Sequence, residues 1–443
     1  MSSSRWIING ASIITDEPAR EKENRQSYRV IPRGYLAVEN KYIKEIGEGT
    51  PPSHFMESYK EVRGDHLLLA PGMVNTHGHA AMSLFRSYAD DLPLMKWLEE
   101  KIWPIEAKLT EEEIYWGTLL SIVEMIKSGT TTFTDLYFYM EEAARAVKES
   151  GIRAVISQGL LGILDNKNEA INYSNYLFDK WHGSGEGRIS IILGPHALFT
   201  CPPDYLEQVI EISQSKNMPL QIHLSESQEE FDNTVKSYGR SPTQQLNHLG
   251  FLDQPVIAAH CVHLTQEDLD IIAEKQVGVS HNPGSNLKLG SGIAPVTEML
   301  QRGIKVGLGT DGASSNNNLD MFEEMRLAAL LPKGYHQEPT LMDAPQAFKL
   351  ATTGGAEVLF LNKLGKLKEG YLADLIGINL NSPRMRPAHD LLANLVYSAT
   401  GSDVDFTAVN GQILMEKGEL LTLDEERILA HAQELGDKLV NSS

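Results

Sequence analysis

The sequence contains little cysteine and no long hydrophobic run. Its two cysteines, Cys201 and Cys261, stand far apart and form no C-x-x-C pair, which excludes a disulfide framework and a cysteine-based zinc site. No apolar stretch approaches the ~18 residues that span a bilayer, and the N-terminus lacks a basic region followed by a long apolar segment. We therefore expect a protein of the reducing cytoplasm, without a classical secretion signal and without a membrane partner.

Positive charge is also scarce. The 443 residues include 39 basic and 59 acidic side chains, a formal net charge of −20. No run of lysine and arginine could follow a phosphate backbone, and the excess of negative charge repels nucleic acids and anionic membranes. The composition favours a small neutral or zwitterionic molecule as partner and leaves homo-oligomerisation open. With 42% hydrophobic residues, the chain can bury one large core and a smaller one.

Segments rich in β-branched residues alternate with helical patterns along the middle of the chain. We expect eight strands, near residues 67–77, 131–138, 153–160, 189–197, 219–225, 255–261, 277–282 and 304–311. Between them lie segments with apolar residues at helical spacing and a glycine at or after the C-terminal end. Eight such repeats predict an α/β fold, a closed (β/α)8 barrel of the TIM type over residues 67–369.

The two ends of the chain have a different pattern. Residues 1–66 and 370–443 contain short alternating segments separated by turn residues, which is typical of β-strands. We expect both ends to assemble into one small β-sandwich beside the barrel. Residues 424–443 are expected to follow it as an amphipathic, solvent-facing helix.

The most informative motif is His77-Gly-His79, at the end of the first expected barrel strand. Side chains at positions i and i+2 of a strand point to the same face, and two neutral imidazoles presented together make half of a site for zinc or a neighbouring metal. A pair of surface or core histidines is the alternative interpretation. In TIM barrels the chemistry lies at the C-terminal ends of the strands, where this chain places His77, His79, Asp135, His196, His223, His260, His281 and Asp311. Such a ring argues against unrelated core histidines.

These residues resemble a known family. His77-x-His79, His223 in QIHLSES, His260 in AAHCVHL, the segment SHNPGSN (280–286) and Asp311 in GLGTDGASSNN look like the amidohydrolase superfamily. More closely, the chain resembles the 5′-methylthioadenosine/S-adenosylhomocysteine deaminases, in a branch that includes triazine chlorohydrolases and guanine deaminases. The resemblance extends over essentially the whole chain.

The resemblance implies one divalent metal ion, expected to be Zn²⁺, with Fe²⁺, Mn²⁺ or Ni²⁺ as alternatives. Its ligands would be His77, His79, His223 and Asp311. Three imidazoles and one carboxylate leave positive charge on the ion, which lowers the pKa of a bound water toward ~7. Asp311 would also accept a proton from that water. A second ion is not expected, because the fourth strand has His196 in the region where two-metal amidohydrolases carry a bridging lysine.

The resemblance also implies roles in catalysis and substrate binding. Glu226 would protonate a ring nitrogen of the substrate and later pass a proton to the departing ammonia. His260 would hydrogen-bond the attacking oxygen and the developing oxyanion. The implied substrate contacts are Glu106, against the ribose hydroxyls, together with Glu226, His196, Trp103, Gln158 and His281.

Each of these residues also has a purely structural interpretation. Glu226 could stabilise the start of the following helix through the helix dipole, and Asp311 could be an ordinary turn aspartate before a glycine. Glu106 could cap the helix that begins after Thr110. The aromatic residues of the same loop, Trp97 and Trp103, and also Leu94, could form an apolar wall for the substrate or serve packing alone.

The predicted function is metal-dependent hydrolytic deamination of a 6-aminopurine nucleoside, giving the inosine analogue and ammonia. 5′-Methylthioadenosine, S-adenosylhomocysteine and adenosine are the candidate substrates. Relatives that bind adenosylhomocysteine well can use arginines after the third strand, whereas this chain has Gln158 and a nearby Lys167. We therefore expect methylthioadenosine to be preferred.

Two alternatives to this function stay open. One is hydrolysis of another heteroaromatic ring, such as guanine or a triazine, and the other is a catalytically silent metal-binding scaffold on the same fold. A dinucleotide site is a third formal possibility, because residues 307–312 match G-x-G-x-x-G. This match closes the last barrel strand instead of opening a Rossmann unit, so it does not support dinucleotide binding.

Overall fold

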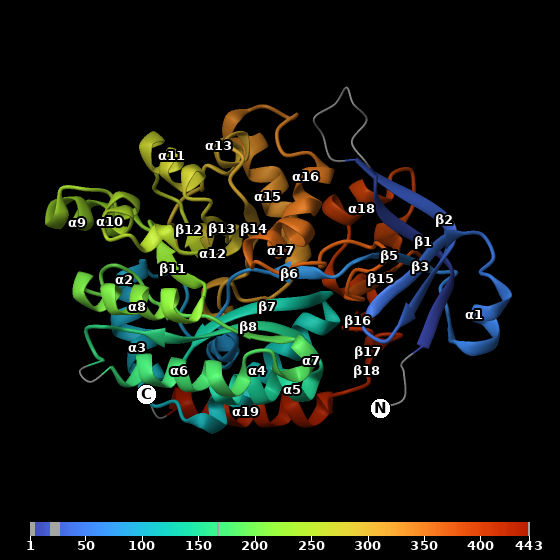
Figure 1. Cartoon of the computed structure of the whole chain (residues 1–443), viewed down its shortest axis with the longest axis horizontal. Helices are drawn as coiled ribbons and strands as arrows, with labels where there is room; N and C mark the ends of the chain where they lie inside the picture. Colours follow the sequence, from blue (N-terminus) through green and yellow to red (C-terminus); the bar gives the residue numbers. More distant parts are fainter. Residues whose placement is uncertain (1–4, 18–26, 166–167, 442–443) are drawn as a thin grey trace.

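A computed structural model describes residues 5–17, 27–165 and 168–441 of the chain (Figure 1). Two nine-stranded sheets organise it. One sheet is assembled from both ends of the chain, and the other is the parallel barrel of the middle. In Figure 1 the strands of the N-terminal part stand to one side of the helix-covered barrel. The expected α/β architecture is confirmed.

The barrel sheet consists of parallel strands whose neighbours follow chain order. Its members are β6 (Met73–Asn75), β7 (Thr130–Tyr137), β8 (Arg153–Leu160), β9 (Ile189–Ile191), β10 (Gly194–Pro195), β11 (Leu220–Leu224), β12 (Val256–His260), β13 (Gly278–His281) and β14 (Val306–Leu308). β14 pairs with β6, and a parallel bridge between Leu193 and Leu220 joins the other two edges. The sheet is therefore closed, as the eight β/α repeats predicted.

Two expected barrel strands are interrupted in the structure. The strand expected over residues 67–77 divides at Gly72 into β5 (Leu67–Pro71), which belongs to the other sheet, and β6. A Cβ atom at Gly72 would lie 2.1 Å from Thr131 Oγ1, so the chain can pass between the sheets only with glycine there. The strand expected over residues 189–197 is likewise split into β9 and β10.

Helices surround the barrel, and several have clear start and stop signals. Thr110 and Glu113 form a capping box at the start of α4, and Gly151 ends α5 in the left-handed conformation with φ of 88°. The helices of this layer are α4 (Glu111–Lys127), α5 (Met140–Ser150), α6 (Glu169–Trp181), α8 (Pro203–Lys216), α9 (Gln228–Tyr238), α10 (Pro242–His248), α11 (Gln266–Glu274), α13 (Val296–Gln301), α15 (Met321–His336) and α17 (Gly355–Val358).

Short helices occupy the loops and the connection to the C-terminal part. The long loop after β6 contains η1 (Ala80–Phe85), α2 (Leu94–Trp97), η2 (Leu98–Ile102) and α3 (Trp103–Glu106). The remaining short helices are α1 (Ser53–Ser58), α7 (Ser184–Gly187), η3 (Phe251–Asp253), α12 (Pro283–Lys288), α14 (Ala313–Asn316), α16 (Ala344–Lys349), η4 (Leu350–Gly354), η5 (Pro383–Met385), α18 (Leu391–Tyr397) and η6 (Gly401–Asp403).

The terminal sheet combines both ends of the chain. Its strand order is β18 (Glu419–Leu420), β17 (Gln412–Glu416), β16 (Val404–Val409), β15 (Leu375–Asn379), β5, β1 (Arg5–Glu17), β2 (Ser27–Glu39) and β3 (Tyr42–Glu48), with β4 (Lys60–Arg63) also paired to β1. The ring of Trp6 packs on that of Phe406 with centroids 5.8 Å apart, inside a core cluster that both ends of the chain supply. This arrangement is the expected composite β-sandwich.

Contacts between the two parts are buried. Arg153, at the start of β8, donates to Asp374 Oδ2 at 2.8 Å, and both side chains are almost fully buried. The C-terminal helix α19 (Glu425–Asn441) buries Ile428 and Leu435 and packs against α4 of the barrel (Figure 1). It is thus partly buried on the barrel instead of fully facing solvent. No helix of the described residues is long and apolar enough to cross a membrane.

Candidate metal centre and active site

Four histidine rings and one carboxylate meet at the C-terminal ends of the barrel strands. His77 and His79 follow β6, His223 lies near the end of β11, His260 ends β12 and Asp311 follows β14. The ring centroid of His77 lies 4.9 Å from that of His79, 4.8 Å from that of His223 and 5.4 Å from that of His260. Barrel closure brings these residues together, because each strand ends at the same rim.

The rings of His79 and His223 face each other through their Nε2 atoms. His79 Nδ1 donates to the carbonyl oxygen of Leu136 at 2.6 Å, and His223 Nδ1 donates to that of His196 at 2.8 Å. Because both Nδ1 atoms carry a proton, each ring in its neutral form presents an Nε2 lone pair, and these two atoms lie 3.4 Å apart. Two facing lone pairs repel each other unless a cation lies between them. Nδ1 donation to a carbonyl is also the usual support of a metal-binding histidine.

Asp311 supplies the negative charge of the cluster. Its Oδ1 lies 3.2 Å from His79 Nε2 and 3.5 Å from His77 Nε2. Its Oδ2 accepts from Ser285 Oγ at 2.5 Å and Ser315 Oγ at 2.9 Å, so the carboxylate is held on the side away from the rings. Burial would raise the pKa of Asp311, but the nearby rings of His77 and His79 outweigh burial and hold this pKa well below the usual value.

The electrostatics of the three rings suit a cation. Burial lowers the pKa of His77 to about 4 and holds that of His223 well below its usual value, so both rings are neutral at pH 7. Burial also acts on His79, but the Asp311 carboxylate overrides it and raises the pKa of His79 to about 9. A metal ion would take the place of that proton. His77 Nε2 is buried without a hydrogen-bond partner, as an unused ligand atom would be.

The donor set therefore fits a single divalent ion. The candidate ligand atoms of His77, His79 and Asp311 lie within 4.8 Å of one another, and so do those of His77, His223 and His260. The two groups share His77 and are joined by the contact between His79 and His223. Three imidazole nitrogens and a carboxylate oxygen are a common ligand set for zinc and related metals.

His260 and Glu226 form a second pair beside the cluster. His260 Nδ1 donates to Asn286 Oδ1 at 2.8 Å, which turns Nε2 toward Glu226 Oε2 at 3.8 Å. The backbone of His260 is left-handed, with φ of 72°, a conformation that non-glycine residues adopt at a cost. The side chain is almost fully buried. The pair thus places a proton-accepting ring nitrogen next to a carboxyl group at the edge of the cluster.

Glu226 does not cap the following helix. The N-cap of α9 is Ser227, whose side chain accepts from the backbone N–H of Glu230. The carboxylate that accepts the nearby backbone N–H groups is Glu230, bonded to Ser225 at 3.2 Å and to Glu226 at 2.9 Å. The Glu226 side chain is left to face His260, and burial raises its pKa, which favours the protonated form. Glu226 is therefore not the cap of α9.

Glu106 does not cap a helix either. The cap of α4 is Thr110 with Glu113, whereas Glu106 ends α3 and accepts from Tyr137 Oη at 2.7 Å. Burial raises the pKa of Glu106 above its usual value. The hydrogen bond from Tyr137 and the charge of His79 offset part of this rise. Glu106 therefore lies on the side of the cluster formed by His79 and the end of β7.

Two further histidines lie at the rim. The ring of His196 is 4.7 Å from that of His223, and its Nδ1 lies 2.9 Å from Thr200 Oγ1. His281, at the end of β13, is buried, and its Nδ1 has no hydrogen-bond partner. Burial lowers the pKa of both rings to about 3, so both are neutral at pH 7. The structure thus brings His196 into ring contact with the cluster and places His281 on the neighbouring strand.

Other sequence candidates are not brought to the cluster by any observed contact. Trp97 is buried in the main core, where its Nε1 donates to the carbonyl oxygen of Ala89 at 3.0 Å, so its role is packing. Trp103 is half-buried, and Leu94 packs against the same core. Gln158, near the end of β8, is buried with its Oε1 unpartnered. Lys167 lies outside the described residues.

Sequence reasoning missed several partners of the cluster. Tyr137 stands two residues after Asp135 on β7 and thus on the same strand face, a relation that the sequence contained. Ser285 and Asn286 stand next to each other in the segment SHNPGSN, of which His281 is the one residue predicted to contact the substrate. Their partners, Asp311 and His260, come from other strands, so nothing in the local sequence connects them.

A buried carboxyl group behind the cluster predicts a pH-dependent stability. Glu324 of α15 accepts from Gly284 N at 2.9 Å and Asn316 Nδ2 at 2.7 Å, and burial raises its pKa from 4.5 to about 8. Between pH 4.5 and about 8, Glu324 therefore keeps its proton in the folded state and loses it in the unfolded state. This stabilisation is complete below pH 4.5 and is lost as the pH rises to about 8.

We expect the free energy of unfolding to fall by up to about 1.4 kcal/mol per pH unit from Glu324 alone over this range. Glu324→Gln should flatten the pH dependence, because glutamine does not titrate. Denaturant unfolding of both proteins at several pH values measures the effect. Identical slopes for the wild type and the variant would contradict it.

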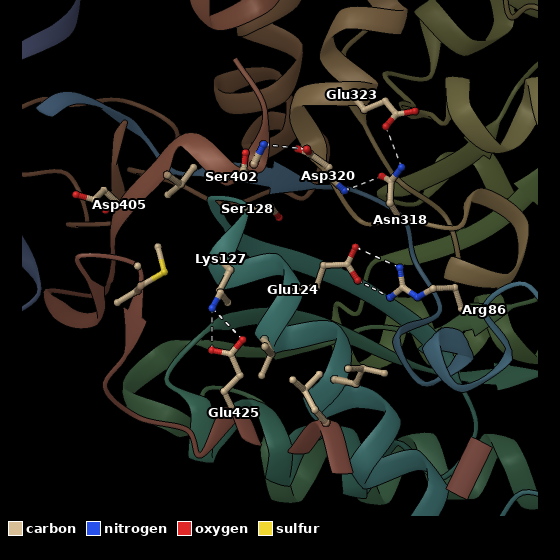
Figure 2. A pocket seen from close by; sticks show the side chains of 17 residues that line it. Arg86, Glu124, Lys127, Ser128, Asn318, Asp320, Glu323, Ser402, Asp405 and Glu425 are labelled. Carbon is tan, nitrogen blue, oxygen red and sulfur yellow. Dashed lines mark hydrogen bonds and ion pairs between the residues drawn. The ribbon is translucent and has the colours of Figure 1, made fainter. Parts of the chain in front are cut away.

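A cavity of about 820 Å³ lies elsewhere, between α4, α19 and β16 (Figure 2). Lys127 donates to Glu425 at 2.8 Å on one of its walls, and Arg86 pairs with Glu124 on another. Figure 2 shows these charged groups already satisfied by each other. None of the clustered histidines lines this cavity, so it is not the candidate catalytic site.

Comparisons with known proteins agree with this geometry. The model of the amidohydrolase family matches residues 68–414. The chain is 52% identical over 412 residues to the 5-methylthioadenosine/S-adenosylhomocysteine deaminase of Syntrophomonas wolfei, covering 93% of this chain and 95% of that protein. The structure is similar to that of an adenosine deaminase from Xanthomonas campestris with bound zinc, with a TM-score of 0.91, 31% identity and 99% of each chain covered.

A more distant structure shares the fold alone. The zinc complex of atrazine chlorohydrolase from Arthrobacter aurescens superposes with a TM-score of 0.87 at 24% identity, over 97% of this chain and 99% of that chain. The architecture of barrel and terminal sheet is therefore retained at low sequence identity.

Proposed function

This chain belongs to the amidohydrolase family, and on that basis we propose that it is a metal-dependent deaminase of 6-aminopurine nucleosides. The reaction replaces the 6-amino group by oxygen and gives the inosine analogue and ammonia. 5′-Methylthioadenosine and S-adenosylhomocysteine are the leading substrates, with adenosine as a third. The observation that carries the proposal is the cluster of three imidazoles and Asp311 beside the pair of Glu226 and His260.

We assign the metal ligands as His77, His79, His223 and Asp311, and the ion as zinc. Facing Nε2 lone pairs, an unpartnered His77 Nε2 and the nearby carboxylate support this assignment. The zinc-containing structure of the similar Xanthomonas campestris deaminase supports the choice of metal. When bound, such an ion supplies a Lewis acid that makes a water molecule acidic near neutral pH.

The remaining steps fall to the side chains of the cluster. Burial raises the pKa of Glu226, which favours its protonated form, and this carboxyl group donates a proton to a ring nitrogen of the purine. Since His260 Nδ1 donates to Asn286, Nε2 is the ring atom that hydrogen-bonds the attacking oxygen. Asp311 Oδ1 accepts one proton of the attacking water. The Glu226 carboxylate, which has given up its own proton, takes the other water proton from the hydroxyl group of the tetrahedral intermediate and delivers it to the departing amino group, so that ammonia leaves as the new C–O double bond forms. The proton on Asp311 then returns to Glu226.

The substrate is proposed to lie between the cluster and the loop after β6. Glu106 accepts hydrogen bonds from the two ribose hydroxyls, because an ionised carboxylate has several acceptor positions and no donor. His196 contacts the substrate from the rim next to His223. Trp103, Gln158 and His281 remain proposed substrate contacts without an observed link to the cluster.

Two assignments concern the whole chain. We propose residues 1–66 with 370–443 as the terminal domain and 67–369 as the catalytic barrel. Two features cross these borders: β5, which follows residue 66, pairs within the terminal sheet, and α19, from the second terminal segment, packs on the barrel. We propose the cytoplasm as location, because both cysteines are buried and unpaired.

The alternative functions are less well supported. Guanine or triazine hydrolysis would use the same metal cluster, but the triazine-hydrolysing relative shares only 24% identity, against 52% for the methylthioadenosine deaminase. A catalytically silent scaffold would not need the pair of His260 and Glu226, in which His260 adopts a left-handed backbone conformation.

A substrate panel tests the proposed function. Metal-replete enzyme is offered 5′-methylthioadenosine, S-adenosylhomocysteine, adenosine, guanine and a triazine while ammonia release is followed. The 6-aminopurine nucleosides should release ammonia at rates far above those of guanine and the triazine. Preferential turnover of guanine or the triazine would replace the proposed substrate class, and no release from any compound would favour a scaffold.

The rim of the site predicts the preference for the 5′ substituent. Ile163, Leu164 and Phe199 are 53%, 70% and 43% exposed, and Ile163 N donates to Thr200 O at 3.1 Å, so two neighbouring loops form one apolar rim. The ring of Phe199 lies 5.7 Å from that of His196, which connects the rim to the cluster. An apolar methylthio group suits this surface better than a zwitterionic homocysteine tail.

We expect a higher kcat/KM for 5′-methylthioadenosine than for S-adenosylhomocysteine. Residues 161–175, which follow β8, contain no arginine to pair with the carboxylate, and a charge-assisted contact of this kind contributes about 1.5–3 kcal/mol. Initial rates with both substrates at several concentrations give the ratio. An equal or reversed preference would show that another cation holds the tail.

A further inference from the structure

The hydrogen bond between Tyr137 and Glu106 joins two parts of the chain that the sequence keeps apart. Glu106 ends the short helix α3 in the long loop after β6, and Tyr137 is the last residue of the barrel strand β7. Tyr137 Oη donates to Glu106 Oε1 at 2.7 Å. No other side-chain donor to this carboxylate is found in the part of the chain that the structure describes.

Tyr137 is fixed by the barrel and lies next to the metal cluster. Asp135 and Tyr137 share one face of β7, because side chains two residues apart on a strand point the same way. The Tyr137 ring is almost fully buried, and its centroid lies 6.2 Å from that of His79. A rigid strand end therefore holds the hydroxyl between a proposed metal ligand and the loop carboxylate.

The same hydrogen bond favours the ionised form of Glu106. Burial raises the pKa of this carboxyl above its usual value, and the O–H that Tyr137 donates offsets part of that rise. An ionised Glu106 is acceptor-only, and after one bond to Tyr137 it keeps free lone pairs on both oxygens. Two adjacent hydroxyl groups of a ligand could donate to them together.

We propose that Tyr137 is a positioning residue that holds Glu106 for the cis-diol of the ribose and thereby selects ribonucleosides over 2′,3′-dideoxynucleosides. The inference rests on the proposed function, because it takes a purine nucleoside as substrate. Tyr137 acts through Glu106 and does not itself contact the reacting atoms. Its contribution should therefore depend on whether the substrate carries the diol.

Tyr137→Phe tests this role with a pair of substrates. Phenylalanine keeps the buried ring and removes only the hydroxyl. With 5′-methylthioadenosine, the variant should lose about tenfold in kcat/KM, mainly through a higher KM. With the 2′,3′-dideoxy analogue of the same compound, kcat/KM should stay within about twofold of the wild-type value. Initial-rate measurements on metal-replete proteins give all four values.

Two further variants make the test specific. Tyr35→Phe removes a similar hydrogen bond, from Tyr35 Oη to Glu45 Oε1 at 2.6 Å in the terminal sheet. This variant should leave kcat/KM unchanged for both substrates. Glu106→Gln should reproduce the diol-selective loss, and adding Tyr137→Phe to it should cost little more, because the two residues act as one unit.

The outcomes separate the inference from the proposed function. An equal loss with both substrates, or additive losses in the double variant, would overturn the role of Tyr137 while leaving the deaminase intact. If the wild type deaminates neither compound, the proposed function fails and the inference fails with it. Should Tyr137→Phe fold poorly, the selectivity of Glu106→Gln alone decides: a loss confined to the diol substrate supports the inference, and an equal loss overturns it.

Discussion

Replacement of His223 by alanine is expected to abolish metal binding and deaminase activity together. His223 Nε2 faces His79 Nε2 at 3.4 Å, and its Nδ1 is held by the carbonyl oxygen of His196. The substitution removes one of three imidazoles from a buried site. His260 is the neighbouring ring of the described cluster that could replace it, but its hydrogen bond to Asn286 holds it in place. A structural or catalytic ion that loses one of four ligands is bound much more weakly.

Elemental analysis and the rate of ammonia release, measured on the same samples, check this prediction. His66→Ala is the matched control, since His66 pairs with Asp405 outside the cluster at 3.0 Å and its loss should leave both quantities near wild type. Full metal occupancy in His223→Ala would show that the ligand assignment is wrong.

Glu226→Gln is expected to lower kcat by roughly 10²-fold or more while metal content and melting temperature stay near the wild-type values. Glutamine keeps the size of the side chain and most of its hydrogen bonding but carries no transferable proton. Stability should change little, because Ser227 and Glu230, and not Glu226, satisfy the backbone N–H groups before α9.

The matched control for this variant is Glu229→Gln, an exposed carboxylate in the first turn of the same helix. It should leave kcat unchanged and cost at most about 0.3–1 kcal/mol of stability through the helix dipole. A Glu226→Gln enzyme that deaminates at a near-normal rate would contradict the proposed proton transfer and leave that task to Asp311.

The barrel could be predicted from sequence because its strands have strong local patterns. The strand expected over residues 153–160 has the same bounds as β8, where every side chain is buried. The division at Gly72 could not be predicted, since β5 and β6 are both apolar and fully buried. Hydrophobic pattern is the same on either side of this glycine, and only the close approach to Thr131 reveals that the chain changes sheets.

The cluster of histidines followed from one topological rule, that chemistry in such barrels lies where the strands end. The positions of His77, His79, His223, His260 and Asp311 at one rim agree with that rule. Contacts between distant elements did not follow from it. Tyr137 and Glu106 are 31 residues apart on a strand and a loop helix, and no periodic pattern connects them. The position of Trp97 in the loop is compatible with either a substrate contact or packing, and only the structure shows that its ring lies in the core.

Incorporation of oxygen from water distinguishes hydrolytic deamination from other reactions of the same substrate. Metal-replete protein is incubated with 5′-methylthioadenosine in water enriched in ¹⁸O, and the products are identified by mass spectrometry while ammonia is quantified. We expect an intact nucleoside in which the amino group has been replaced by one labelled oxygen, with one ammonia released for each molecule converted. Unchanged substrate, or free adenine from cleavage of the glycosidic bond, would contradict it.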